Sequence, residues 1–215
     1  MSNPTTPASI GPGEFFPVVG VGPHVKPWPE GAHYDPELLL NGDRRNVLDH
    51  YRYWTVEAIV ADLDSKRHKL QIAIENWQHD LNIGSIVRTA NAFNVSGVHI
   101  VGKRDWNKRG AMVTDRYLTV HHHPTVEDFA LWCKENELPI IGIDNVPGSK
   151  QLESAQLPEK CVFLFGQEGA GMSDEGIAVC EVLYEINQYG STRSMNASAA
   201  GAIAMYHWAL QHLPQ

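Results

Sequence analysis

From residue 70 to the end of the chain, short apolar runs alternate with stretches whose apolar residues recur at spacings of three and four. The short runs predict strands, and the stretches between them predict helices. The predicted strands are Leu70–Glu75, Gly97–Val101, Pro139–Asp144, Val162–Phe165 and Leu183–Ile186. The predicted helices are Ile83–Phe93, Val126–Asn136, Asp174–Cys180 and Asn196–Leu213.

The order of these elements indicates the fold class. The apolar runs do not alternate with polar residues, which is typical of parallel strands buried on both faces. Strands that alternate with helices form an α/β sheet with helices on both sides. We therefore expect residues 70–215 to be one α/β domain built on a parallel sheet.

The chain before residue 70 has a different pattern. The first forty residues hold eight of the 13 prolines, and proline fixes φ and removes a hydrogen-bond donor. Residues 1–36 are therefore expected to be a Pro-rich flexible arm. Apolar spacing predicts two short helices in an N-terminal extension over residues 37–69, with a break near Asn41-Gly42 or Tyr53-Trp54.

Composition and charge narrow the class of protein. The chain has 215 residues, 43% hydrophobic and 20% charged, so most of it should be globular. Three cysteines without a CxxC pair argue against a disulfide framework and favour a cytoplasmic location. Apolar runs are too short for a membrane-spanning helix, so no membrane partner is expected. The net charge of -8 means that any nucleic-acid contact requires a local basic patch.

Residues just after the strands are the candidates for chemistry, because ligands of open α/β sheets bind beyond the carboxyl ends of the strands. After the first strand, Asn82 is a good N-cap for the next helix. Arg88 then lies on a flank of that helix, next to its apolar stripe. Arg88 also has a simpler interpretation, because surface ion pairs of arginine are common.

Two further loops follow the fourth and fifth predicted strands. Residues 166–173 contain three glycines, which allow positive φ and close approach of a ligand to the backbone. Glu168 lies between these glycines, and the loop matches neither GxGxxG nor a Walker A loop. Residues 189–196 are polar, and Ser194 or Asn196 can cap the last helix.

Residues 101–123 carry a local excess of positive charge, with Trp106 and Tyr117 interspersed. Basic and aromatic residues together suit a nucleic-acid groove, although a solvated loop has the same composition. The basic residues are Lys103, Arg104, Lys108, Arg109 and Arg116. His121, His122 and His123 are adjacent, so they cannot all face one metal from a regular element, and no metal site is expected.

Three segments carry spaced motifs in a fixed order. The first holds Asn82, Gly84, Arg88, Ala90 and Phe93. The second holds Gly166, Glu168, Gly171, Met172 and Ser173. The third holds Ile186, Gly190, Ser194, Met195, Asn196, Ser198 and Ala200. Over residues 70–213 the chain thereby resembles the SpoU/TrmH branch of the SPOUT RNA methyltransferases. It departs from the family pattern at Asn94 (glycine in the family), Asn187 (proline) and Phe163 (leucine).

The resemblance implies a SPOUT methyltransferase domain with a C-terminal trefoil knot and a homodimer with the site at its interface. It implies S-adenosyl-L-methionine as cofactor, no metal, and transfer of a methyl group to a ribose 2'-hydroxyl of tRNA or rRNA. The catalytic residues would be Arg88, Asn82, Glu168 and Asn196. The cofactor-binding residues would be Ile143, Gly166, Ile186, Ser194 and Met195.

Small residues on the last helix predict where the two subunits of such a dimer meet, together with the helix that starts near Asn82. These small residues are Ala197, Ala200, Gly201 and Ala204. Two other functions remain as alternatives. A non-catalytic RNA-binding or assembly protein would share the fold, but the joint presence of Asn82, Arg88, Glu168 and Asn196 disfavours it. A nucleotide-binding oxidoreductase is disfavoured by the missing GxGxxG.

Overall fold

The computed structural model describes residues 20–78, 82–167 and 169–214. The chain divides into two compact units, residues 1–59 and residues 60–215, and the boundary falls inside helix α2 (Val56–Asp64). The sequence pattern placed the start of the sheet domain at residue 70. The structure differs because α2 and the turn after it belong in part to the second unit.

The first unit contains α1 (Pro36–Asn41) and the 3-10 helix η1 (Asp49–Tyr51). The side chain of Asp43 is buried at its centre, where Arg45 pairs with it at 2.7 Å and the backbone N–H of Tyr53 donates to it at 3.0 Å. Burial opposes ionisation of Asp43, but these hydrogen bonds outweigh it and lower its pKa to about 2.

The predicted flexible arm does not extend to residue 36. Val21 forms an antiparallel bridge with Asp43, and the backbone N–H of His24 donates to the carbonyl of Leu39 at 2.9 Å. Asp35 caps α1. Prolines prevent regular elements here, yet they leave the other backbone groups free to bond with the neighbouring turn. Residues 20–36 are therefore part of the first unit, while the arm's residues 1–19 lie outside the described residues.

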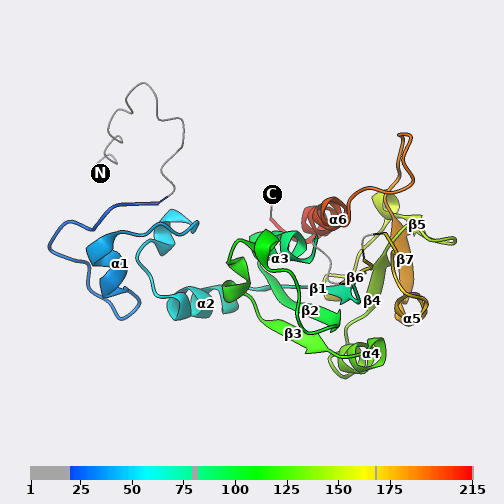
Figure 1. The fold of residues 1–215 in the computed structure, drawn as a ribbon, viewed down its shortest axis with the longest axis horizontal. Helices are drawn as coiled ribbons and strands as arrows, with labels where there is room; N and C mark the ends of the chain where they lie inside the picture. Colours follow the sequence, from blue (N-terminus) through cyan, green and yellow to red (C-terminus); the bar gives the residue numbers. More distant parts are fainter. Residues whose placement is uncertain (1–19, 79–81, 168, 215) are drawn as a thin grey trace. The chain divides into compact units, whose positions relative to one another are not determined.

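The second unit is built on a seven-stranded parallel sheet in the order β3-β2-β1-β6-β4-β7-β5 (Figure 1). β1, β2 and β3 are neighbours both in the sheet and in sequence, whereas β6 lies between β1 and β4. The strands are β1 (His68–Asn76), β2 (Val95–Gly102), β3 (Val120–His123), β4 (Ile140–Ile143), β5 (Lys150–Gln151), β6 (Cys161–Phe165) and β7 (Val182–Glu185).

Helices cover both faces of this sheet (Figure 1). On one face, α3 (Asn82–Ala92) and α6 (Ala197–His212) pack on the larger apolar core, which contains Trp208 and Phe163. On the other face, α4 (Val126–Glu135) and α5 (Asp174–Val179) pack on a second core around Phe129. The connections η2 (Arg109–Ala111), η3 (Thr114–Tyr117) and η4 (Leu152–Ser154) are 3-10 turns.

All five predicted strands and all four predicted helices of this unit are confirmed, within a few residues at each end. Strands β3 and β5 were missed. β3 carries three histidines in four residues, and β5 has only two residues, so neither has the apolar run that marks a buried strand. Both lie at the edges of the sheet, where a strand needs less apolar sequence.

Candidate functional site

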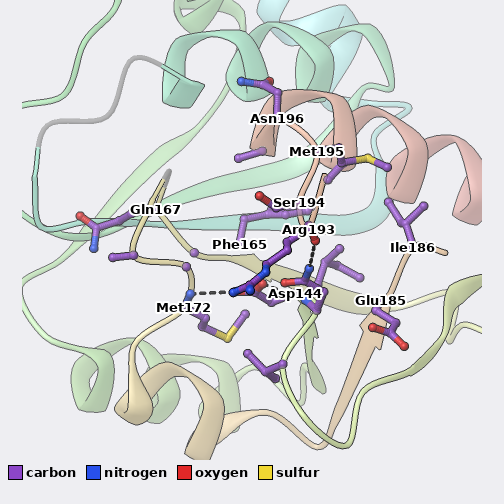
Figure 2. Close-up of a pocket in the computed structure, with 18 of the residues that line it drawn as sticks. Asp144, Phe165, Gln167, Met172, Glu185, Ile186, Arg193, Ser194, Met195 and Asn196 are labelled. Carbon is purple, nitrogen blue, oxygen red and sulfur yellow. Dashed lines mark hydrogen bonds between the residues drawn. The ribbon is translucent and has the colours of Figure 1, made fainter. Parts of the chain in front are cut away.

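A cavity of about 450 Å³ lies beyond the carboxyl ends of β4, β6 and β7. Three loops line it, with lining residues within 143–146, 165–167 with 169–172, and 185–197, and Figure 2 shows their side chains converging around it. All five predicted cofactor residues line the cavity, namely Ile143, Gly166, Ile186, Ser194 and Met195. The structure thus brings together residues that are up to 52 positions apart in the sequence, since Met195 and Ile143 differ by that number.

The glycine-rich loop after β6 folds back tightly on itself. Gln167 and Gly171 exchange backbone hydrogen bonds of 3.0 Å in both directions. A Cβ atom at Gly166 would lie 2.1 Å from the backbone nitrogen of Met172, so only glycine fits there. Gly171 has a φ of 73°, which favours glycine again. These two glycines let the backbone itself form a wall of the cavity.

Two carboxylates hold this loop, one from each strand that flanks β6. Glu75 at the end of β1 is fully buried and accepts hydrogen bonds from both the backbone N–H, at 2.8 Å, and the hydroxyl of Ser173. Asp144 directly follows β4 and accepts from the backbone N–H of Met172 at 2.7 Å (Figure 2). Sequence reasoning missed both residues. An acidic residue at the end of an apolar strand was the signal that could have found them.

The loop after β7 is tied to two other loops. The side chain of Asn145 donates to the carbonyl of Arg193 at 2.5 Å (Figure 2). The backbone N–H of Asn187 donates to Glu153 Oε1 at 3.0 Å. The family has proline at this position, and proline has no N–H to donate. The departure at Asn187 therefore gives this chain an anchor that the family pattern lacks.

Asn82 and Asn196 meet where two helices begin. The Asn196 amide nitrogen donates to Asn82 Oδ1 at 2.8 Å, and Asn82 is buried. Asn196 is also the N-cap of α6, where its side-chain oxygen accepts from the backbone N–H groups of Ser198 and Ala199. Of the two residues predicted to cap α6, Ser194 and Asn196, the structure therefore confirms Asn196. Because helix N-termini carry partial positive charge, the start of α3 and the start of α6 together favour a negative group beside this contact.

Arg88 and Glu168 complete the predicted catalytic set. Arg88 is exposed on α3, and no acid in residues 20–78, 82–167 or 169–214 forms an ion pair with it. The simpler interpretation of Arg88 as half of a surface ion pair therefore finds no partner in those ranges. Glu168 lies outside the described residues, so its place in the site stays a prediction.

The basic segment after β2 is exposed, but its aromatic residues are not. Lys103, Arg104, Lys108, Arg109 and Arg116 are all exposed. Trp106 and Tyr117 are buried, so the expectation that they contribute to a nucleic-acid groove was wrong. Their rings are buried in the domain instead of facing a ligand. The composition of the segment does not distinguish a buried ring from an exposed one.

Alternate histidines of β3 share one side of the sheet. His121 and His123 flank His99 of β2, whose Nδ1 lies 2.9 Å from His123 Nε2 and whose ring stacks on that of His121. His122 is bonded elsewhere, to the carbonyl of Gly102. The described residues contain no group of side chains suited to a metal. Nor does any helix of the described ranges have the length and apolarity to cross a membrane.

Comparison with known proteins adds a family match. The model of the SpoU rRNA Methylase family matches residues 69–206. A protein of Borreliella burgdorferi named tRNA (guanosine(18)-2'-O)-methyltransferase is 25% identical over 147 residues, which are 67% of this chain and 67% of that protein. The matched region corresponds to the second structural unit.

Two solved structures share the fold. The TrmH/SpoU tRNA modifying enzyme of A. aeolicus superposes with a TM-score of 0.63 at 22% identity, over 73% of this chain and 83% of that one. The SpoU methyltransferase AviRb of Streptomyces viridochromogenes, solved in complex with AdoMet, gives a TM-score of 0.62 at 22% identity. That match covers 71% of this chain and 61% of AviRb, so this chain spans less than two thirds of AviRb's length.

Proposed function

This chain belongs to the SpoU rRNA methylase family, and from that premise we propose that it transfers a methyl group from S-adenosyl-L-methionine to a ribose 2'-hydroxyl of tRNA or rRNA. The observation that carries the proposal is the position of the cavity. It lies at the carboxyl edge of the sheet, lined by all five residues that the family resemblance implies for the cofactor. The Asn82–Asn196 contact and the exposed Arg88 belong to helices that start at the same edge.

The cavity fits S-adenosyl-L-methionine in size and in chemistry. Its volume of about 450 Å³ lies within the range of small-molecule sites. Phe165, Met172 and Ile186 provide apolar walls, and the backbone of the glycine-rich loop provides polar edges. Ile143, Gly166, Ile186, Ser194 and Met195 would hold the cofactor, without a metal. When bound, the cofactor supplies an electrophilic methyl group.

A ribose hydroxyl is weakly acidic, so the enzyme must orient it and stabilise the charge that develops on its oxygen. Arg88 is suited to both tasks, because its planar guanidinium can bind the hydroxyl oxygen and the adjacent phosphate together. A guanidinium resists deprotonation. Arg88 therefore holds the geometry, and a phosphate oxygen of the RNA takes the proton.

Asn82 and Asn196 would help to stabilise the negative charge that develops on the ribose oxygen. Their hydrogen bond joins the N-termini of α3 and α6, and both helix ends favour a negative group nearby. Bound RNA brings such groups, both in its phosphates and in the developing alkoxide. Glu168 would complete the set from the glycine-rich loop.

The RNA would lie over the basic segment after β2. Lys103, Arg104, Lys108, Arg109 and Arg116 provide exposed positive charge in a chain whose net charge is -8. Only Lys108 among these five forms an ion pair within the described ranges, with Asp115 at 3.0 Å. Free cations on an acidic protein concentrate the attraction for phosphate at one place.

The protein would act as a homodimer, but through a different face of α6 from the one predicted. Gly201 and Ala204 are buried, and Gly201 packs close to Ile86 and Phe165 of the same chain. Gly201 and Ala204 therefore serve packing within the subunit, while Ala197 and Ala200 are half-buried and line the cavity. Three large apolar residues instead lie exposed on α6 at spacings of three and four, namely Ile203, Tyr206 and Leu210. This stripe supports a two-fold interface along α6.

A C-terminal trefoil knot and a cytoplasmic location are parts of the same proposal. The knot is proposed from the family resemblance, and the hydrogen bond from Asn145 to Arg193 places the loop after β7 beside the loop after β4. The three cysteines are all unpaired, and burial raises the pKa of each thiol to about 12, which suits a protein that needs no disulfide.

The proposal is tested on RNA from cells with and without this protein. Mass spectrometry of the digested tRNA and rRNA pools should find one 2'-O-methylnucleoside that is lost without the protein. Purified protein should restore it from S-adenosyl-L-methionine in the presence of a chelator. If no methylated nucleoside is lost and the purified protein still binds RNA, the protein is instead a non-catalytic RNA-binding protein.

A further inference from the structure

The connection between β2 and β3 is firmly anchored on both sides. Trp106 and Ala111 are buried in the main core, and Tyr117 is buried at the end of η3. The backbone of Gly110 lies so close to α3 that a Cβ there would meet the backbone nitrogen of Ser85 at 2.7 Å. The side chain of Thr114 donates to the carbonyl of Ala111 at 2.7 Å. This connection therefore has a fixed shape on the surface of α3.

The tip of the connection is exposed like its basic residues, but it is apolar and its backbone is strained. Met112 is 64% exposed and Val113 is 54% exposed. Both have left-handed backbone conformations, with φ of 47° and 66°. Such a conformation is unusual for any residue with a side chain and more so for β-branched valine. Strain of this kind persists where the surrounding structure enforces it, and it is concentrated at functional sites.

Free positive charge lies on both sides of this tip. Arg109 precedes it and Arg116 follows it, both exposed, and neither forms an ion pair within residues 20–78, 82–167 and 169–214. The tip also adjoins the predicted catalytic helix. Gly84 of α3 contacts the backbone of Gly110, and Arg88 lies four residues later on the same side of that helix.

We infer that Met112 and Val113 form an apolar wedge that packs against an unpaired nucleobase of the RNA, next to the ribose held by Arg88. The inference rests on the proposed function and adds to it the class of substrate. That substrate is single-stranded or locally unpaired RNA, because the bases of a continuous duplex are stacked and offer no free face. A methionine sulfur packs well on aromatic rings, and apolar wedges of this kind separate base steps in other nucleic-acid complexes.

The charges favour RNA over a second copy of this chain as the occupant. A second copy also carries a net charge of -8, but it would pair with Arg109 and Arg116 only if its acids lay opposite them. Every RNA segment, in contrast, presents phosphates beside its bases. The α6 stripe of Ile203, Tyr206 and Leu210 already offers a larger apolar face for self-association.

The left-handed backbone allows a test that separates folding from binding. Glycine adopts positive φ without strain, so Met112→Gly and Val113→Gly remove each side chain and keep the loop conformation. Val113→Asn is a second variant that keeps the conformation and adds polarity, because asparagine tolerates this region. Leu131→Ala is the matched control, since Leu131 is 56% exposed but lies on α4, on the opposite face of the sheet.

The assay follows methyl incorporation into total RNA from cells lacking the protein, as a function of RNA concentration. In both glycine variants the KM for RNA should rise about tenfold, the loss expected for one stacked base. The melting temperature, the Kd for S-adenosyl-L-methionine and the mass in solution should stay as in the unmodified protein and in Leu131→Ala. An unaltered KM for RNA in all three tip variants would overturn the wedge.

Two other outcomes are distinct. A change of mass in solution in the glycine variants would overturn the wedge in favour of contact with a second copy. If the unmodified protein transfers no methyl group to any RNA, the proposed function itself fails, and the wedge fails with it.

Discussion

Two groups of buried polar side chains lie on the same sheet and have opposite relations to the cavity. Glu75 is fully buried at the carboxyl end of β1 and bonds to Ser173 in the cavity loop, 98 residues further along the chain. His99 is fully buried within β2, and its ring nitrogens bond to Gln71 of β1 and His123 of β3. The first group connects the sheet to a loop that lines the cavity, whereas the second connects strands to one another.

The difference shows that burial and a shifted pKa do not by themselves identify a functional site. Burial lowers the pKa of His99 to about 2, helped by His121 and His123 nearby. Yet His99 lies in the middle of a strand against Phe129 and Trp132 of α4. Position at the ends of the strands separates the two groups better than electrostatics does.

Removing the exposed arginine of α3 should have the largest effect. Arg88→Ala should lower turnover by roughly a hundredfold or more, because the stabilisation of developing charge belongs to the transition state. Affinity for S-adenosyl-L-methionine should barely change, since the cavity loops follow other strands. Single-turnover methylation with parallel cofactor titration measures both.

The lysine variant serves as the control for charge alone. Arg88→Lys should recover only part of the rate, because an ammonium group lacks the planar fork that binds phosphate and hydroxyl together. Near-normal turnover in Arg88→Ala would remove this residue from the catalytic set and leave it as an ordinary exposed arginine.

A second change tests whether Glu75 acts through the loop. In Glu75→Gln, one oxygen can still accept from the Ser173 backbone, but the other position carries an amide donor facing the Ser173 hydroxyl. The loop should loosen, and the Kd for S-adenosyl-L-methionine should rise about tenfold, in line with the loss of one charge-assisted hydrogen bond. Isothermal calorimetry measures the Kd.

Asp144→Asn is the matched comparison. The Asp144 carboxylate accepts two backbone N–H groups, from Met172 and Asn145, and one amide oxygen can still serve the Met172 contact. The amide nitrogen that then faces the Asn145 N–H cannot accept its proton, but Asp144 is only half-buried, so water can replace that contact. The effect on the Kd should therefore be smaller than that of Glu75→Gln, whose side chain is fully buried. Equal affinities in Glu75→Gln and the unmodified protein, at equal melting temperatures, would mean that Glu75 does not position the loop.

The histidine group should have the smallest effect on function and a clear effect on stability in acid. Unfolded His99 takes up a proton below its ordinary pKa of 6.5, while folded His99 stays neutral down to about 2. Its contribution to stability is therefore complete above pH 6.5 and decreases as the pH falls. For one such group the slope is about 1.4 kcal/mol per pH unit.

Urea unfolding at several pH values between about 6.5 and about 5 measures this slope. Most carboxylates titrate at lower pH, so they contribute little to it. His99→Gln should make the dependence shallower, because the titrating group is gone. Cofactor affinity should show no matching trend. A slope that is unchanged in His99→Gln would assign the acid sensitivity to other residues.

The sequence pattern predicted the sheet well because buried parallel strands need apolar runs. β4 and β6 are apolar throughout, and β1 has a shorter apolar run over residues 72–74. The motifs also selected the residues of the cavity, because glycines and helix caps are local requirements of chain geometry. Gly166 and Asn196 are examples, each explained by contacts with its near neighbours.

The remaining features depend on contacts that no local pattern contains. Glu75 differs from a surface glutamate through its burial and its hydrogen bonds to Ser173 and Trp77. Trp106 has the composition of a stacking platform, but its ring lies in the core. Gly201 could have faced a partner subunit until the structure placed Ile86 against it. Each of these was decided by tertiary packing.

The bond between Asn82 and Asn196 spans 114 residues. Closing so long a segment costs chain entropy that only the completed fold repays, so the contact forms late in folding. During synthesis, β1 and α3 emerge well before α6, and the site stays open until the last helix has left the ribosome. A nascent chain that stops before Asn196 can have most of its sheet and still lack a working site.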